Sequence, residues 1–475
     1  MTGRWIDGPR PQGVAVGTRG GKPVPAATVR GGAVRHIDWA RILPPVILLY
    51  SILLPMEVRV EIAGQSLFLY RIVCIMCIPW ALLMLSRHGM RRNPADFFMY
   101  VAAVWMIVSF FGFYGDLPNG IRGLPLALDF LMPYVIFRVG IRSLDDLRVV
   151  LIFFVPGAFA VGLVMALESL SHQYIMSPVA AEIFGSRAQY IDGQAVGQFT
   201  PEREIRLGLM RASGPFAHPI LAGMVLGGLL PMYWYSGLRG WPYVLGIGVP
   251  FFALFSLSSG AILALLIVIG LVVYDFMERR TTFLTWPLLI FSVLGVLLVL
   301  QFVTENGVFR FLIRFTLDPR TGFYRTLVWE YGIKSMMNHP WFGIGFSDYE
   351  RLAWMTPSID AHWLLAGVRH GFIVPLAQLA AVVTVVVRLV EGLLRQGSGL
   401  NSDLVKGILF SLVALVIGGF TVAFFGGAQI WFFGILGAAA AVGAEMGRNA
   451  GIPGRARGSG RSGHIRSSAG PLRLK

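Results

Sequence analysis

The chain consists mainly of long apolar runs separated by short polar segments. A helix needs about 20 mostly apolar residues to cross the hydrocarbon core of a bilayer, and most of the runs approach that length. The fourth run is short and carries Asp129 and Pro133. The pattern predicts an all-α integral membrane protein with about twelve transmembrane helices, at 41–56, 66–86, 95–114, 124–139, 148–169, 216–236, 241–257, 259–277, 284–304, 363–388, 404–424 and 427–446.

The composition excludes a set of soluble domains. Charged residues make up 14% of the chain and the mean hydropathy is +0.67, whereas soluble domains carry about 25% charged residues. The 40 Lys and Arg outnumber the 25 Asp and Glu, a balance that on a soluble chain would suggest a nucleic-acid partner. On this chain the excess indicates orientation, because Lys and Arg accumulate in cytoplasmic loops. No nucleic-acid partner is therefore expected.

The basic residues predict which segments face the cytoplasm. If both termini are cytoplasmic, 26 of the 40 Lys and Arg fall in the tails and the inner loops. The chain then divides into a basic, disordered tail at 1–40, a polytopic membrane domain at 41–446 and a second basic, disordered tail at 447–475. Two long segments, at 171–215 and 305–362, fall on the outer side. Loops of this length that have order of their own are usually functional.

The second outer loop is rich in arginine. Between Asn306 and Trp329 it carries a single acid, Asp318. Two interpretations are open: arginine is simply the common basic residue of this chain, or its guanidinium groups bind an anion such as a diphosphate. The amphipathic segment 307–317 either lies in the headgroup plane beside a lipid-linked substrate or only scaffolds the interface. The arginines are Arg310, Arg314, Arg320 and Arg325.

A few ionisable residues fall inside or beside the predicted helices. Arg71, Glu168 and Arg211 lie near helix ends, where long side chains reach the interface at low cost. Arg369 lies about two turns inside the tenth predicted helix, and ionisable residues at membrane depth are often functional. The neighbouring His370 is interpreted as a hydrogen-bonded residue of helix packing.

The motifs of common soluble enzymes are missing. The chain has no Walker loop, no HExxH, no dinucleotide fingerprint and no DxD pair in an outer loop. Cys74 and Cys77 form a CxxC inside an apolar run, where packing cysteines are favoured over a metal or redox site. We therefore expect no metal and no cofactor. An outer-face enzyme would instead draw on an activated, lipid-linked donor.

Four segments together resemble the O-antigen ligase/polymerase superfamily. Arg211 to Pro219 opens a predicted helix, Arg325 to Trp329 precedes Asn338 to Phe346, and Trp354 to Gly371 spans the end of the second outer loop. The order and spacing of these motifs carry the resemblance, which covers about 120–375.

The resemblance implies a GT-C-type glycosyltransferase of the bacterial inner membrane. Members transfer a glycan from undecaprenyl diphosphate to an acceptor at the outer face, so the implied partners are a lipid-linked oligosaccharide, membrane lipids and a chain-length regulator or other polysaccharide-export proteins. By motif match, Arg211 and Arg325 bind the diphosphate and stabilise its developing charge. His362 is the implied base or acceptor orienter, assisted by Asp360. Where the family often has a Ser-Arg-Gly turn, this chain has Ser258-Ser259-Gly260.

Five further residues are candidates for binding the diphosphate or the sugar. Arg320 and Arg369 would add positive charge, and His218 belongs to the first motif. His339 either contacts the substrate or forms the turn before the following proline. Trp329 either stacks on a sugar ring or anchors the chain at the membrane interface, as tryptophans commonly do.

The pattern after the second outer loop favours a polymerase over a ligase. Ligases of the family have a His-Asn pair there, followed by a more distant glycine, whereas here Trp363 follows His362 and Gly371 comes nine residues after the histidine. The arrangement of Asp360 and Trp363 is similar to that of exopolysaccharide or O-antigen polymerases. The alternatives are a ligase that uses lipid A core and, from another class, a lipid-linked-sugar flippase or exporter. A transporter should concentrate its charged groups along a midplane pathway.

Overall fold

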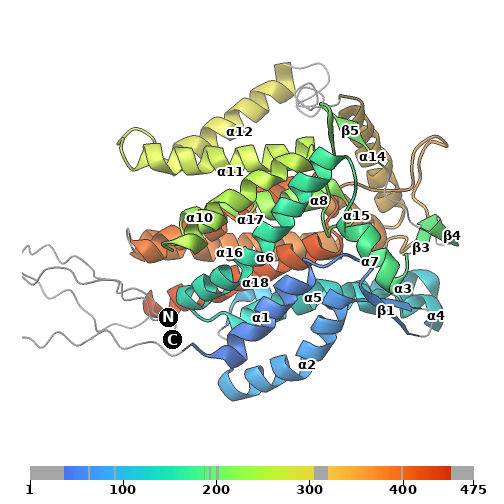
Figure 1. Ribbon diagram of the computed structural model, residues 1–475, viewed down its shortest axis with the longest axis horizontal. Coiled ribbons are helices and arrows are strands. Elements are labelled where there is room, and N and C mark those ends of the chain that lie inside the picture. The colour runs from blue at the N-terminus through green and yellow to red at the C-terminus, as the bar shows by residue number, and fades with distance from the viewer. Residues whose placement is uncertain are drawn as a thin grey trace, which may run out of the picture. The chain divides into compact units, whose positions relative to one another are not determined.

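The computed structural model describes residues 37–62, 65–89, 92–186, 188–191, 194–198, 203–303, 319–396 and 399–450. The predicted tails fall largely outside these ranges, and so does the predicted amphipathic segment at 307–317. Most of the described chain is helical, and the long helices lie side by side (Figure 1).

The helices follow the apolar runs of the sequence, and polar residues fix several of their starts. Asn93 and Asp96 form a capping box at the start of α3, and Ser143 and Asp146 form another at the start of α6. Such boxes satisfy the first backbone N–H groups of a helix. The helices are α1 Trp39–Ser51, α2 Leu69–His88, α3 Pro94–Tyr114, α4 Leu117–Gly120, α5 Gly123–Gly140, α6 Leu144–Ser171, α7 Met176–Phe184, α8 Pro219–Gly227, α9 Leu230–Trp234, α10 Trp241–Gly248, the 3-10 helix η1 Val249–Ser256, α11 Ser259–Glu278, α12 Trp286–Val303, α14 Pro319–Asn338, α15 His362–His370, α16 Ile373–Gln396, α17 Leu400–Gly418 and α18 Gly427–Ala450.

Eight of the described helices are long and apolar enough to cross a membrane. Each overlaps a predicted run, and the protein is a mostly helical, multi-pass membrane protein. Shorter apolar helices coincide with the other four predicted runs, at Trp39–Ser51, Pro219–Trp234, Trp241–Ser256 and Trp286–Phe302. The eight long spans are Leu69–Arg87, Pro94–Tyr114, Leu117–Gly140, Leu144–Ser171, Ser259–Glu278, Ile373–Arg395, Leu400–Gly418 and Gly427–Gly447.

The tenth run differs from its predicted boundaries. The prediction of one helix at 363–388 is wrong, because α15 ends at His370 and α16 begins only at Ile373. Between them Gly371 adopts a φ of 77°, a left-handed conformation that favours glycine. Arg369 therefore lies at the end of a short helix and not two turns inside a continuous span.

The helix α18 is the most buried of the long spans. Within its span 83% of residues are buried, against 28% in α2. It packs against α5 so closely that a Cβ on Gly437 would overlap the backbone of Tyr134, and the run Ala438–Ala441 continues this small-residue surface. By contrast α12 exposes Phe291 and Phe302. Apolar surface of this kind suits contact with lipid.

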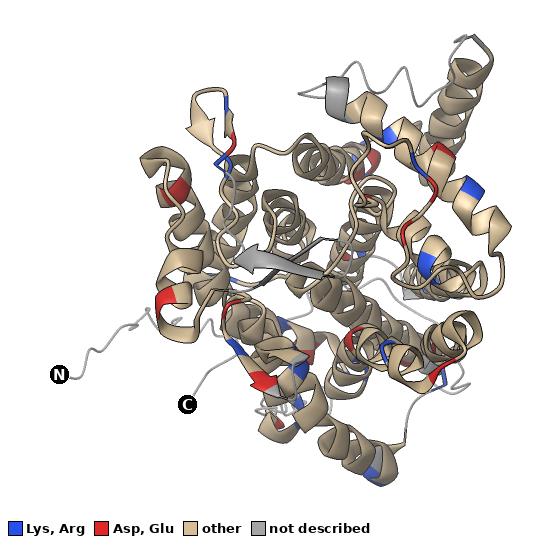
Figure 2. Ribbon diagram, turned by 90° about the vertical axis from the view of Figure 1, so that its right-hand side faces the viewer, with Lys and Arg blue, Asp and Glu red and all other residues tan. Residues whose placement is uncertain are grey.

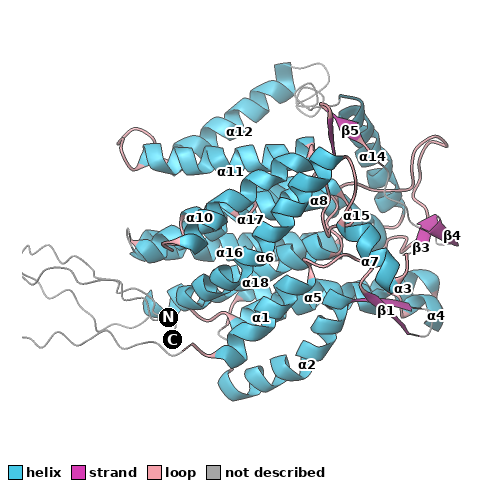
Figure 3. Ribbon diagram, viewed as in Figure 1, coloured by secondary structure: helices cyan, strands magenta, loops and turns pink. Residues whose placement is uncertain are grey.

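Hairpins and long connections gather at one end of the bundle, here called the hairpin end (Figures 1 and 3). Both predicted outer loops, 171–215 and 305–362, contribute their described elements there, with α7 in the first and α14 in the second. The described strands pair as antiparallel two-stranded hairpins. The pairs are β1 Arg59–Ile62 with β2 Gln65–Phe68 (Arg59 opposite Phe68), β3 Ala188–Ile191 with β4 Gln194–Gln198 (Ala188 opposite Gln198), and β5 Ile205–Arg206 with β6 Leu209–Met210 (Ile205 opposite Met210).

The charged residues near helix ends do not reach outward as predicted. Arg71 of α2 donates to both carboxylate oxygens of Asp129 on α5, at 2.9 and 2.5 Å. Glu168 is fully buried and Arg211 is 5% exposed. Partners inside the protein hold these side chains, because an uncompensated buried charge would cost several kcal/mol (about 3–5).

Candidate functional site

Charged residues from three separate segments of the chain act on one another at the hairpin end, the end that faces the viewer in Figure 2. The β5–β6 hairpin region contributes Glu204, Arg206 and Arg211, α14 contributes Arg325, and Asp360 lies just before α15. The charges of Asp360, Arg206 and Arg211 all act on Arg325. These five residues are called the arginine cluster below. Sequence reasoning named Arg211, Arg325 and Asp360, and the structure brings them together.

Contacts with Glu204 and Ser256 hold Arg211 in the arginine cluster. Its Nη1 lies 2.5 Å from Oε2 of Glu204, and its Nε donates to the carbonyl of Ser256 at 3.4 Å. Its backbone N–H also donates to the Glu204 carbonyl, at 2.9 Å. A guanidinium has five N–H donors, so Arg211 keeps donors for a second anion while it is bound to Glu204.

Arg325 is the least compensated cation of the cluster. In the part of the chain that the structure describes it forms no ion pair, whereas Arg206 and Arg211 share Glu204 at 3.4 and 2.5 Å. Desolvation lowers the pKa of Arg325, repulsion from the other two arginines acts in the same direction, and Asp360 opposes them. An arginine stays protonated in proteins, so Arg325 presents a charge that an anion would stabilise.

His218 caps α8 beside the cluster. Its Nδ1 accepts a hydrogen bond from the N–H of Ile220 at 3.3 Å, so a neutral ring carries its proton on Nε2. Desolvation and the charge of Arg211 lower the pKa of His218, while Asp360 and Glu204 act in the opposite direction. The ring is therefore neutral near pH 7, and its Nε2–H group is available as a donor.

Glu168 fixes the segment that carries Arg211. Its Oε2 accepts hydrogen bonds from the backbone N–H groups of Ser213 and Gly214, at 3.3 and 2.9 Å. Its Oε1 accepts from those of residues 175 and 176, at 3.1 and 3.4 Å. Hydrogen bonds to an ionised acceptor are the strong ones. Glu168 therefore ties the two ends of the first outer loop together, a role that its place near a helix end did not reveal.

Arg206 was missed by sequence reasoning. Its Nη1 donates to the carbonyl of Leu257 at 3.4 Å, directly before Ser258-Ser259-Gly260. The hairpin thus brings an arginine to the turn from which, by the resemblance, an arginine is missing. One signal could have found it: Glu204 and Arg206 are two residues apart, the spacing that puts side chains on the same face of a strand.

His362 is buried apart from these charges. It is 6% exposed, and its ring lies against Trp363 and Phe424, with centroids at 5.1 and 5.3 Å. Its Nε2 has no hydrogen-bond partner of normal geometry among the described residues, while the Gln378 side chain and the Phe424 backbone act on the ring against the desolvation that lowers its pKa. Asp360, two positions earlier, is exposed and acts on Arg325 and on His218 but is not among the groups that act on His362.

Arg369 and Arg122 form a separate pair of cations beside the same aromatic ring, that of Phe346. The guanidinium of Arg369 lies 5.2 Å from the centre of the Phe346 ring, and that of Arg122 lies 4.7 Å from the same ring. Cation–π contacts of this kind stabilise a guanidinium without neutralising it. The residues of the arginine cluster are not among those that act on Arg369, so the structure does not bring Arg369 into the cluster.

The remaining candidates lie in packing contacts or outside the described side chains. Trp329 donates through Nε1 to the carbonyl of Phe420 at 3.0 Å and stacks on its ring. His339 lies in the turn after α14, where its carbonyl accepts from the N–H of Gly343 at 3.0 Å. His339 thus lies in a turn, as one of its two interpretations requires, and the Trp329 ring packs against Phe420. The side chain of Arg320 lies outside the described ones.

The motif around Gly343 is a backbone joint that holds α14 against α15. The N–H of Ile344 donates to the carbonyl of Val368 at 2.8 Å. Gly343 has a φ of 65° and Gly371 one of 77°, and a Cβ on either would overlap backbone, that of α15 for Gly343 and that of Trp341 for Gly371. The joint fixes the chain on both sides of Asp360.

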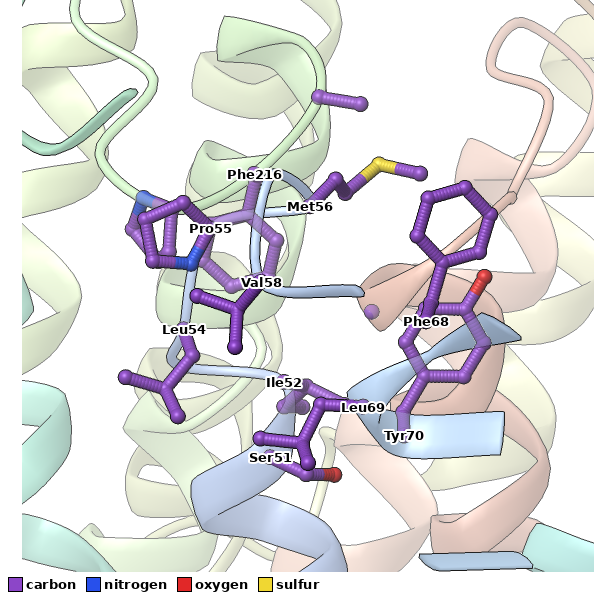
Figure 4. A pocket seen from close by; sticks show the side chains of 13 residues that line it. Ser51, Ile52, Leu54, Pro55, Met56, Val58, Phe68, Leu69, Tyr70 and Phe216 are labelled. Atoms are coloured by element: carbon purple, nitrogen blue, oxygen red, sulfur yellow. The ribbon is translucent and has the colours of Figure 1, made fainter. Parts of the chain in front are cut away.

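A small cavity lies beside the Arg211 segment, between the end of α1, the β1–β2 hairpin and residues 215–217 (Figure 4). Its volume is about 10 Å³, which is about the room that one water molecule needs. Apolar side chains such as Leu54, Val58 and Phe68 surround it. It therefore cannot hold a sugar or a phosphate.

The arginine cluster is suited to bind an anion. It combines three guanidinium groups with only two carboxylates, and a guanidinium group binds phosphate oxygens bidentately. Among the described residues no group of three His, Cys, Asp or Glu side chains is placed to hold a metal ion. Cys74 and Cys77 are free and buried in α2, as the packing interpretation of the CxxC predicts.

The family described as O-antigen ligase matches residues 243–376. This match confirms the resemblance to the O-antigen ligase/polymerase superfamily over that part of the chain, and it supports a ligase-like or polymerase-like function without distinguishing the two. The matched residues include Arg325, Asp360 and His362, whereas Arg206 and Arg211 precede them. No curated protein matches the chain.

Proposed function

We propose that this chain, whose residues 243–376 match the O-antigen ligase family, is a bacterial polysaccharide polymerase. It transfers a glycan from undecaprenyl diphosphate to a growing chain at the periplasmic face of the inner membrane. In this proposal twelve helices of a GT-C-type glycosyltransferase cross the membrane and both termini are cytoplasmic. The observation that carries the proposal is the arginine cluster at the hairpin end, which combines Arg211 and Arg325 from two loops.

The arginine cluster would bind the diphosphate of the donor. When the bond between the anomeric carbon and the diphosphate oxygen breaks, negative charge develops on the leaving diphosphate. Preorganised cations aimed at such a charge usually make the largest contribution to catalysis. Arg325 gains most from this charge because it is not paired, and Arg206 replaces the arginine that the Ser258-Ser259-Gly260 turn lacks. The Nε2–H of His218 donates to a phosphate oxygen.

Asp360 is the general base in this mechanism. Its carboxylate accepts the proton of the acceptor hydroxyl as the hydroxyl oxygen bonds to the anomeric carbon. The resemblance implied that His362 is the base, but we assign this role to Asp360 because the His362 ring is buried among aromatic side chains. His362 instead positions the segment that carries Asp360, because its backbone N–H donates to the carbonyls of Gly419 and Val422 at 2.8 and 3.2 Å.

A ligase is the second candidate, because the matching family is described as O-antigen ligase. Trp363, which stands where ligases have an asparagine, favours the polymerase. A flippase or exporter has less support, since ionisable residues of the helices pair with one another. Arg71 binds Asp129, and Arg138 binds Asp96 at 2.9 Å.

Substitution of Arg325 tests the proposal. Arg325→Ala should abolish long-chain polymer while the amount of protein in the membrane stays unchanged, because the leaving diphosphate loses its uncompensated cation. Arg325→Lys should fail too, since an ammonium group cannot bind phosphate bidentately. Lys334→Ala is the matched control, as Lys334 is an exposed residue of the same helix and its loss should leave polymer length unchanged. Normal polymer in Arg325→Ala would contradict the proposed diphosphate role.

A deletion strain distinguishes the polymerase from the ligase. Loss of a polymerase should leave single repeat units on undecaprenyl diphosphate. Loss of a ligase should leave long chains on the same lipid, because polymerisation continues while transfer to lipid A core stops. Extraction of the lipid-linked saccharides and measurement of their length give the answer.

A further inference from the structure

A second cavity lies at the end of the bundle opposite the hairpin end. It is formed where α3 begins and where α16 and α18 end, and its volume is about 360 Å³. That volume is within the range of ligand-binding pockets, about 300–1,000 Å³. The residues that line it are Arg92, Asn93, Arg388, Arg395, Gly443, Ala444 and Gly447.

The cavity carries excess positive charge. Three arginines and no carboxylate line it. Arg388 and Arg395 share one nearby acid, Glu391, at 4.0 and 3.8 Å, and exposed pairs at such distances stabilise little. Among the described residues Arg92 forms no ion pair. At least two of the three guanidinium groups are thus available to an anion.

The side of the cavity formed by α18 leaves room for a bulky group. Gly443, Ala444 and Gly447 line it with almost no side-chain volume. A Cβ on Gly447 would meet no atom within 4 Å. The arginines therefore surround space that is open next to the helix.

An exposed apolar stripe runs along α16 toward the cavity. Val383, Val387, Val390 and Leu394 are exposed, and their spacing of three and four residues places them on one face of the helix. In a membrane protein such a face contacts hydrocarbon. The arginines at 388 and 395 lie on the same helix beside this stripe, so the headgroup region and the hydrocarbon region meet at the cavity.

We propose that this cavity binds the phosphate headgroup of an anionic phospholipid, whose acyl chains lie along the stripe of α16. Guanidinium groups bind phosphate oxygens bidentately, and basic pockets between membrane helices bind anionic headgroups. Free inorganic phosphate has the same headgroup chemistry but has no chains to contact the stripe. The apolar surface therefore favours the lipid, and the site is independent of the proposed glycosyl transfer.

The test measures lipid binding to the full chain. The purified protein in phosphatidylcholine nanodiscs is compared with protein in discs that contain phosphatidylglycerol, and bound phosphatidylglycerol is counted by native mass spectrometry. Substitution of Arg388→Ala together with Arg395→Ala should weaken phosphatidylglycerol retention by about tenfold or more. Arg280→Ala is the matched control, because Arg280 is an exposed arginine after α11 that packs on Phe276 and does not line the cavity. It should retain the lipid.

A second variant separates the cavity from general surface charge. Gly447→Leu fills the open space without changing any charge and should weaken retention as much as the double variant. Measurement of the unfolding temperature of Gly447→Leu in phosphatidylcholine discs checks that this variant folds. The Gly447→Leu variant then tests the proposal even if the double variant does not fold. Unchanged retention in Gly447→Leu would overturn the proposal. The proposal would also be overturned, in favour of free phosphate, if inorganic phosphate raised the unfolding temperature of the protein as much as phosphatidylglycerol does.

Discussion

At the scale of single residues, charge compensation decides which arginines can bind a ligand. Arg71 and Arg138 are each paired with one buried or nearly buried carboxylate, at 2.5 and 2.9 Å. Breaking such a pair costs about 3–5 kcal/mol, so these arginines serve the fold. Arg325 has no such partner among the described residues. Its position beside Arg206 and Arg211 raises its energy unless an anion binds, which is the property that a diphosphate site needs.

The assignment of the base is tested by exchanging carboxylate for amide. Asp360→Asn should lower kcat by about 10²–10⁴-fold with little change in KM, because the amide keeps the shape but cannot accept the proton. His362→Phe should keep most of the activity, since a phenyl ring suits the aromatic surroundings. Transfer of glycan from a lipid-linked donor in proteoliposomes measures both. An inactive His362→Phe beside an active Asp360→Asn would return the role to the histidine.

The lowered pKa of His218 predicts a loss of stability at acid pH. The fold favours the neutral ring, so this contribution is complete above the unfolded value of about 6.5 and is lost as the pH falls below it. His218→Asn keeps an N-cap acceptor but does not titrate. Thermal unfolding of both proteins between pH 5 and 7.5 should show a smaller acid loss in the variant. Parallel pH profiles of the two proteins would contradict this prediction.

Among the members of the arginine cluster, the sequence predicted only those that lie in a recognisable motif. Arg211, Arg325 and Asp360 lie in motif segments and were predicted. Arg206 and Glu204 were not, because their contacts depend on how the β5–β6 hairpin folds back on η1. No local pattern reports that the Leu257 carbonyl accepts from an arginine 51 positions earlier.

At the scale of elements, hydropathy found the apolar helices but not the joint between α15 and α16. Apolar residues lie before Arg369 and His370 and again after Gly371, so the hydropathy of the run does not distinguish a continuous helix from a broken one. The break depends on the packing of the Asn338–Phe346 segment against the end of α15, which involves residues far apart along the chain. The same packing explains the two glycines of the joint.

Alanine substitutions at the joint should be strongly destabilising. A non-glycine residue at positive φ costs about 1–3 kcal/mol, and the Cβ of Gly343→Ala or Gly371→Ala would also overlap backbone. We expect a loss above about 3 kcal/mol, seen as a large fall in unfolding temperature in detergent. Gly270→Ala in α11 is the control, because a Cβ there meets no atom within 4 Å. A fall of equal size in the control would contradict the steric explanation.

At the scale of the whole molecule, the described parts of both long loops lie at the hairpin end, and the basic residues were used to predict which side that end faces. The structure supports a common side for both loops. The side itself is still a prediction from the charge bias. The proposed function requires the hairpin end to be periplasmic, because a lipid-linked donor is the activated sugar that is available there.

Cysteine labelling tests this orientation. Glu330 on α14 and Arg87 at the end of α2 are exposed at opposite ends, and the native Cys74 and Cys77 are buried. In a background with both native cysteines replaced by alanine, Glu330→Cys should react with a membrane-impermeant maleimide in intact spheroplasts. Arg87→Cys should react only after the membrane is opened. The reverse pattern would place the hairpin end in the cytoplasm.

The pairing of Arg211 with Glu204 means that the proposed diphosphate competes with a carboxylate that is already bound. An incoming anion must displace or share a carboxylate that already lies 2.5 Å from the guanidinium. A singly charged anion such as acetate brings no more charge than the group it replaces, whereas a diphosphate brings several. At Arg211 the exchange therefore favours the diphosphate of the proposed donor over a small monovalent anion.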